Sequence, residues 1–126
     1  MTLFPSPETG TRGFLSTPPN PSYAGEGENL TLAWNYTLDA SLRAVQFSRG
    51  VTGVNITYIG HGKSTGEMNM TSKYQARFRG QAGSTRAELT ILTVQSSDEA
   101  TYHLNVVSNH PTFIFHDVDV IVHCKY

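Results

Sequence analysis

The sequence predicts an all-β fold, an antiparallel sandwich or barrel, from three observations. Roughly seven to nine short segments are rich in β-branched and aromatic residues and alternate in polarity with a period of two. Turn residues separate these segments at intervals of about 8–12 residues. No stretch sustains the periodicity of an amphipathic helix. The 126-residue chain, 38% hydrophobic and 15% charged, has the length and composition of one globular domain.

The N-terminal region is rich in Pro, Gly, Ser and Thr up to residue 28. We expect residues 1–13 to form a flexible N-terminal segment. In the stretch STPPNPS that follows, Pro18, Pro19 and Pro21 exclude a helix and permit only an interrupted edge strand.

The clearest strand is LTLAWNY, residues 30–36, in which large apolar residues alternate with small and polar ones. Trp34 falls on the apolar side, so we expect it to be buried. Asn29 and Asn35 fall on the opposite side, which faces solvent.

Further strands are predicted along the rest of the chain, each bounded by turn residues. Their sequences are LRAVQFSRG (42–50), VNITYIG (54–60), KYQARFRG (73–80), AELTILTV (87–94), TYHLNVV (101–107) and FIFHDVDVIV (113–122). The stretch HGKSTGEMN, residues 61–69, is interpreted as a loop or a weak edge strand. One domain is therefore predicted over residues 14–123, with 124–126 as the start of a linker.

Four of these segments resemble strands of a variable-type (V-set) immunoglobulin domain. GENLTLAWNY resembles its second strand and AVQFSR its third; ARFRG and DEATYHL resemble the strands that open with Arg-Phe and that carry the tyrosine corner. The two cysteine positions of that family fall on Trp34 and Leu104, and its core tryptophan position falls on Phe47. The resemblance implies a β-sandwich of two antiparallel sheets whose core lacks the inter-sheet disulfide.

The spacing of the matched residues supports this resemblance. Arg77 and Asp98 are 21 residues apart, the separation that the family uses for a salt bridge at the base of the sandwich. Tyr102 lies two residues before Leu104, as the tyrosine corner requires. We expect Trp34 to pack against Leu104, Phe47 and Tyr102, so that apolar burial replaces the roughly 2–5 kcal/mol of a disulfide.

The last strand departs from the family, because it lacks the Phe-Gly-x-Gly bulge. A vertebrate antigen-receptor domain is therefore disfavoured. The cysteine-poor stretch EGENLTLAWNYTLD is closer to the V-like domains of invertebrate surface receptors and adhesion proteins.

Cysteine content and glycosylation triplets point to different compartments. The single cysteine, Cys124, excludes an internal disulfide and by itself favours the cytosol; it is either a linker residue or a bridge to a neighbouring chain. Asn-x-Thr occurs four times, at Asn29, Asn35, Asn55 and Asn69, which favours the secretory pathway. No signal peptide is visible, so either the chain is cytosolic or Met1 follows a removed signal. We expect an extracellular domain, the ectodomain of a membrane protein.

Several function classes are disfavoured by the sequence. A net charge of −1 with no basic run argues against nucleic acid, and no apolar run approaches a membrane span. No nucleophile elbow or activated pair indicates an enzyme, and no cofactor is implied. Alternation places His116 on the face opposite Asp117 and Asp119, which argues against a metal site.

The function that the resemblance implies is recognition of a protein partner, with homophilic pairing through the sheet of the third, sixth and seventh strands. The candidate contact residues are Gln46, Ser48, His103 and Asn105, with Phe113 and Phe115 as aromatic anchors. The first four are uncharged at neutral pH, and protonation of His103 facing its own copy would weaken a symmetric dimer in acid. Phe113 and Phe115 could instead cap the sandwich.

Two alternatives remain open at this point. One is a soluble carbohydrate-binding sandwich that uses Asn109, His110 and Phe113, and the other is a cytosolic structural immunoglobulin domain. We expect the glycans to lie on one sheet, that of residues 30–36, where Asn29 and Asn35 face solvent, and we expect this face not to be the partner surface. The direction of Asn55, whose strand belongs to the other sheet, is not fixed by the sequence.

Overall fold

The computed structural model describes residues 13–51, 55–63, 66, 68–110 and 112–124, with Val51 and Asn55 described by their backbone alone. The predicted N-terminal segment therefore lies outside the described residues except for Gly13. Within the described part, the elements are β1 (Gly13–Ser16), β2 (Ser22–Gly25), β3 (Leu30–Thr37), β4 (Leu42–Val51), β5 (Asn55–Lys63), β6 (Met68–Met70), β7 (Phe78–Ala82), β8 (Arg86–Ile91), the 3-10 turn η1 (Ser96–Asp98), β9 (Ala100–Ser108) and β10 (Phe113–His123).

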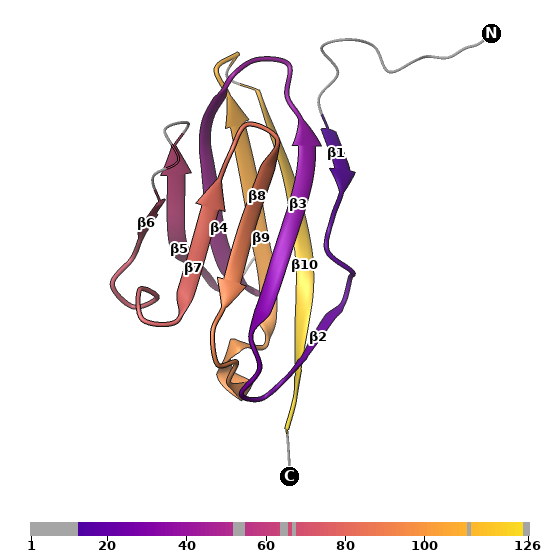
Figure 1. Cartoon of the computed structure of the whole chain (residues 1–126), viewed down its shortest axis with the longest axis vertical. Helices are drawn as coiled ribbons and strands as arrows, with labels where there is room; N and C mark the ends of the chain where they lie inside the picture. Colours follow the sequence, from indigo (N-terminus) through magenta and orange to yellow (C-terminus); the bar gives the residue numbers. More distant parts are fainter. Residues whose placement is uncertain (1–12, 52–54, 64–65, 67, 111, 125–126) are drawn as a thin grey trace, which may run out of the picture.

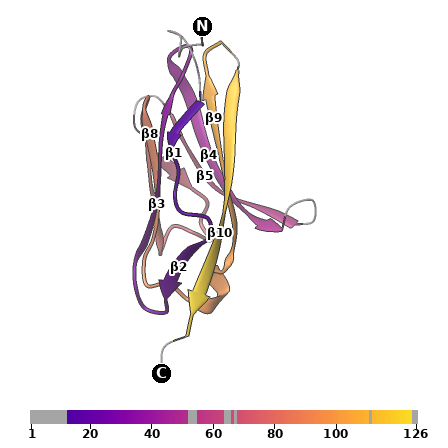
Figure 2. The ribbon, with the colours of Figure 1, turned by 90° about the vertical axis from the view of Figure 1, so that its right-hand side faces the viewer.

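The strands form two sheets that pack face to face (Figures 1 and 2). One sheet has four strands in the order β1-β3-β8-β7, and the other has six in the order β2-β10-β9-β4-β5-β6. The described fold is thus the all-β sandwich that the alternation predicts. The weak strand expected between residues 61 and 69 is in part β6, at the edge of the six-stranded sheet.

One strand pair corrects the expectation of two antiparallel sheets. β2 runs parallel to β10, with Ser22 opposite Val120, while the other pairs are antiparallel. The reason is the proline-rich segment between β1 and β2, in which Pro18, Pro19 and Pro21 interrupt strand pairing. The chain leaves the four-stranded sheet after β1 and joins the edge of the other sheet beside β10 (Figure 2).

The core between the sheets takes the place of the disulfide. Trp34 on β3 is fully buried, and its ring lies 6.1 Å from that of Phe47 on β4, centroid to centroid. Phe47 pairs in register with Leu104 on β9, and both are 1% exposed. The indole Nε1 of Trp34 donates a hydrogen bond to Nδ1 of His116 on β10 at 3.1 Å. The polar edge of this buried indole therefore has a partner, which the sequence did not predict.

Asp98 is the charged centre at the base of the sandwich. Its carboxylate is 1% exposed and accepts two hydrogen bonds of 2.8 Å from Arg77 and one of 2.8 Å from the backbone N–H of Gln95. Burial by itself raises the pKa of Asp98. The hydrogen bonds from Arg77 and Gln95 and the nearby positive charges outweigh burial, so the pKa lies below its usual value.

The tyrosine corner joins this centre to β9. The Tyr102 hydroxyl donates to the backbone oxygen of Asp98 at 2.6 Å. Burial raises the pKa of Tyr102 well above its usual value. The corner and the Arg77–Asp98 pair together fix the turn η1 against the end of both sheets.

Candidate partner-binding face

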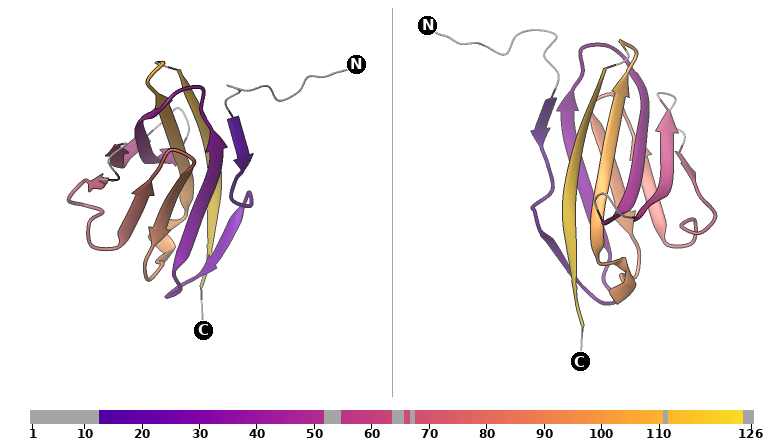
Figure 3. Two further views of the ribbon diagram at one scale, coloured as in Figure 1. Left: turned by 45° about the horizontal axis from the view of Figure 1, so that its top comes forward. Right: turned by 180° about the vertical axis from the view of Figure 1, so that it is seen from behind.

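The candidate partner-binding face is the outer, solvent-facing side of β10, β9, β4, β5 and β6 in the six-stranded sheet. In the right-hand view of Figure 3 this face is toward the reader. Cross-strand register arranges its side chains in rows. One row runs across all these strands: Phe115, Asn105, Gln46, His61 and Asn69 are successive register partners. Neighbouring strands lie about 4.8 Å apart, so this row spans roughly 19 Å.

The next row along the strands brings together residues from four strands. Asp117, His103, Ser48 and Tyr58 are successive partners on β10, β9, β4 and β5. Sequence analysis found Ser48 and His103 but missed Asp117 and Tyr58. Asp117 could have been found, because it lies two residues after Phe115 in an alternating strand and must share its face.

A shallow depression of about 450 Å³ lies on this face. It is lined by Ser48, Ile56, His103, Leu104, Asn105, Phe113, Phe115 and Asp117. Five of the six predicted contact residues are therefore brought together at one place. The sixth, Gln46, is exposed beside the depression as the register partner of Asn105.

Large apolar side chains gather around the depression. Phe113 is 56% exposed and Phe115 is 67% exposed, and their ring centroids lie 6.4 Å apart. Ile56 and Tyr58 on β5 are 53% and 42% exposed. Four of the six exposed large hydrophobic residues of the described chain thus lie on one face. Such a patch, bordered by polar groups, is typical of an interaction surface rather than of a sandwich cap.

One charged side chain, Asp117, lies beside the four candidate contact residues that are uncharged at neutral pH. Nδ1 of His103 lies 2.7 Å from Oδ1 of Asp117, which is half-exposed at 49%. The Nε2 atom of His103 is buried and has no hydrogen-bond partner in the described structure. Strand-by-strand reasoning missed the pair because only the β9–β10 register places Asp117 beside His103. A protonated His103 therefore has a counter-ion within its own chain.

Comparison with known proteins decides the family. The sequence profile described as immunoglobulin V-set domain matches residues 17–123. The chain belongs to the immunoglobulin V-set family. The solved structure of murine CRIg is similar in fold, with a TM-score of 0.70 and 16% sequence identity over 92% of this chain and 99% of that one. No curated protein sequence matches the chain. V-set domains are generally recognition modules rather than enzymes.

The four glycosylation triplets of this V-set domain are divided between its two sheets. Asn29 is exposed next to β3, and Asn35 on β3 is half-buried, with its amide bonded to Ser16 at 2.8 Å and to Arg86 at 3.1 Å. Asn55 is in β5, and its side chain lies outside the described residues. Asn69 is exposed on the outer face, opposite His61.

The positions of the triplets therefore depart from the expectation of a single glycan-bearing sheet, because Asn69 lies on the same face as the candidate contact residues. It lies in the long register row, two strands beyond Gln46 and roughly 10 Å from it. The direction of the Asn69 side chain could not be predicted, because Asn69 lies in the stretch interpreted as a loop or a weak edge strand.

The metal and carbohydrate hypotheses find no support in the described residues. His116 points inward to Trp34, while Asp117 and Asp119 are exposed on the other side of β10, as alternation predicts. No group of three or more potential metal ligands occurs in the described part of the chain. Asn109 bonds Ser41 at 2.5 Å, so its amide is engaged within the loops at that end.

Two further features concern the remaining expectations. Cys124, the single cysteine, is exposed beyond the end of β10. Among the residues described, no helix is long and apolar enough to cross a membrane.

Proposed function

We propose that this V-set domain is the extracellular recognition domain of a cell-surface receptor or adhesion protein, and that it binds a protein partner through the outer face of the six-stranded sheet. Membership of the V-set family supports the recognition role. The Asn-x-Thr triplets at Asn29, Asn35, Asn55 and Asn69 support the extracellular location.

The observation that carries the proposal is the cluster of exposed apolar side chains around the depression. Phe113, Phe115 and Ile56 are each more than half exposed, and exposing them to water costs free energy unless a partner covers them. Ser48 and Asn105 line the same depression and supply hydrogen-bonding groups between the aromatic anchors. Aromatic anchors with a polar surround are the usual composition of a protein interface.

We further propose that the partner is a second copy of this domain. A two-fold axis through the depression would bring the Phe113 and Phe115 pairs of both copies against each other. The carboxylate of Asp117 accepts its hydrogen bond from His103 of the same chain at 2.7 Å, so it has a polar partner of its own where two copies would meet.

Sedimentation velocity at increasing protein concentration tests this proposal. We expect a dimer whose population rises with concentration, and we expect Phe115→Ser to raise its dissociation constant at least about tenfold. Leu15→Ser is the matched control, because Leu15 is 71% exposed but lies on β1 of the other sheet. It should leave dissociation unchanged.

The outcomes separate the two levels of the proposal. If the parent domain stays monomeric at high concentration, the homophilic pairing is wrong. In that case, a different protein that binds the parent domain but not the Phe115→Ser domain would still support the outer face as the binding surface. A captured partner that binds both variants equally would contradict it.

A further inference from the structure

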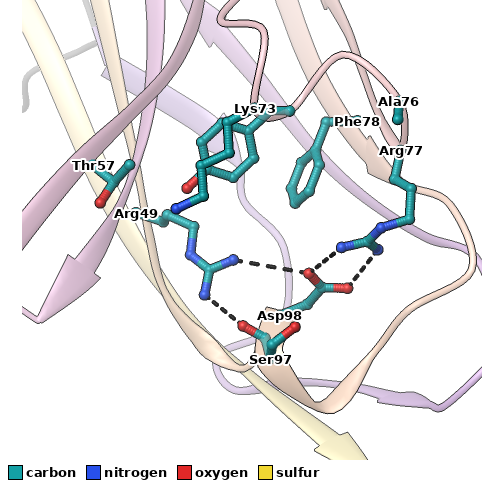
Figure 4. Close-up of a pocket in the computed structure, with 9 residues that line it drawn as sticks. Arg49, Thr57, Lys73, Ala76, Arg77, Phe78, Ser97 and Asp98 are labelled. Atoms are coloured by element: carbon teal, nitrogen blue, oxygen red, sulfur yellow. Dashed lines mark hydrogen bonds and ion pairs between the residues drawn. The ribbon is translucent and has the colours of Figure 1, made fainter.

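A second cavity, of about 260 Å³, lies at the end of the sandwich beside η1, away from the partner-binding face (Figure 4). It shares no lining residue with the depression on the outer face. Its polar lining comes from β4 and β5 of the six-stranded sheet, from the segment before β7 and from η1: Arg49, Thr57, Lys73, Arg77, Ser97 and Asp98. The buried rings of Tyr74 and Phe78, 5% and 2% exposed, form its apolar wall.

The charges of this lining do not balance. Three cationic side chains, Arg49, Lys73 and Arg77, face one carboxylate, that of Asp98, which leaves an excess of two positive charges. Arg77 is committed to structure, because it makes both 2.8 Å bonds to Asp98 and also donates to the backbone oxygen of Leu92 at 3.2 Å. The excess therefore belongs to the other two cations.

Arg49 and Lys73 have unused capacity for an anion. Arg49 donates to the backbone oxygen of Ser97 at 2.6 Å and forms an ion pair with Asp98, in which Nη1 lies 3.8 Å from the carboxylate, too far for a hydrogen bond. Lys73 is exposed, and its Nζ contacts only the Tyr74 ring, 5.6 Å from the centroid, with no carboxylate of the described residues in ion-pair range. In Figure 4 the Lys73 side chain extends to the side of the cavity that Arg49 lines. Two cationic side chains that line one cavity repel each other, and an anion bound between them would relieve that repulsion.

We propose that this cavity binds a small oxyanion, a sulfate or phosphate group, between Arg49 and Lys73. Oxyanions of this kind match guanidinium and ammonium donors, and the excess of two positive charges in the lining suits a dianion. The hydroxyl-bearing residues Thr57 and Ser97 complete the lining. The apolar wall of Tyr74 and Phe78 lowers the local dielectric and strengthens the attraction.

An NMR titration of the isotope-labelled domain tests this proposal. Sodium sulfate is added in one arm and sodium phosphate in another, each against sodium chloride at matched ionic strength. We expect saturable amide shifts confined to residues 49, 57, 73–77 and 97–98. Lys73→Gln should raise the dissociation constant of the oxyanion about fivefold, which is the upper end of the effect expected for losing an exposed ion pair. The arm that saturates at the lower concentration identifies which oxyanion the site prefers.

Lys63→Gln is the matched control, because Lys63 is an exposed lysine at the far end of β5 and outside the cavity lining. It should bind sulfate and phosphate as the parent does, and so should Phe115→Ser on the outer face. Shifts that grow linearly without saturating in both arms, or a Lys73→Gln domain that binds as tightly as the parent, would overturn the proposal. A loss of partner binding in Phe115→Ser with intact oxyanion binding would show that the two sites are independent.

Discussion

The outer face of the six-stranded sheet presents Phe113 and Phe115 to solvent, whereas the outer face of the four-stranded sheet presents polar pairs. On the latter, the hydroxyls of Thr31 and Thr90 bond each other at 2.9 Å, and Arg86 pairs with Glu88 at 2.6 Å. Both faces arise from the same alternation of inward and outward side chains. The comparison teaches that the sandwich determines which residues point outward, while the chemistry of those residues decides which face is suited to a partner.

The substitution with the largest expected effect disrupts the core on which both faces depend. Trp34→Ala should lower the free energy of unfolding by about 3–5 kcal/mol, because it leaves a cavity and removes the hydrogen bond to His116. Urea denaturation followed by far-UV circular dichroism measures this. Thr31→Ala, on the outward side of the same strand, should cost less than about 0.5 kcal/mol. Equal costs for the two substitutions would contradict the strand register.

The next effect concerns the charged centre at the base. Asp98→Asn should lower the free energy of unfolding by about 3 kcal/mol at neutral pH. This is the lower end of the range for breaking a buried ion pair, because the partner Arg77 is partly exposed. The pKa of Asp98 is lowered in the folded state, so its contribution is present above the unfolded value of about 3.9 and is lost as pH falls through the folded value.

Unfolding curves between pH 7 and pH 3 measure that loss. The free energy of the parent should fall more steeply with acid than that of Asp98→Asn, and the two should converge. A constant difference between them across this range would show that the carboxylate charge is not what stabilises the base.

A pair of engineered glycans sharpens the comparison between the faces. Gln46→Asn creates an acceptor triplet with Ser48 on the outer face of the six-stranded sheet, and Glu88→Asn creates one with Thr90 on the four-stranded sheet. In glycosylated material, the first should weaken partner binding at least about 100-fold, or roughly 2.7 kcal/mol, because a glycan excludes the interface. The second should have no effect. Mass spectrometry verifies that each engineered site carries a glycan, and sedimentation then measures the dissociation constants of both proteins. Weaker binding by Glu88→Asn with unchanged binding by Gln46→Asn would place the interface on the four-stranded sheet.

The smallest effect concerns the ion pair on the partner-binding face. Asp117 and His103 contact each other at 2.7 Å on this face. Asp117→Asn weakens that contact, and it should raise the dissociation constant of the proposed dimer by no more than about fivefold. Sedimentation of the variant and the parent at neutral pH compares the two constants. A larger effect than that of Phe115→Ser would contradict the aromatic residues as the main anchors.

The residues differ in how far their surroundings could be predicted. Trp34 could be placed in the core, and Ser48 and His103 on the outer face. Alternation gives each strand only two possible orientations, and the apolar side of the strand shows which of the two faces the core. The direction of β5 was not predictable, since its register with β4 shifts between Phe47 and Ser48. Ile56 and Tyr58, which depend on that shift, were therefore missed.

By itself, the sequence determined the all-β sandwich, its V-set spacing and the core that Trp34 and Phe47 form in place of a disulfide. These follow from periodicity and from spacings along one chain, which local physics controls. Only the tertiary structure decided that β2 runs parallel to β10, that His116 accepts the bond from Trp34, and that Arg49 and Lys73 face one cavity. Each of these joins residues far apart in the chain, and their meeting depends on strand order and register between sheets rather than on any local pattern.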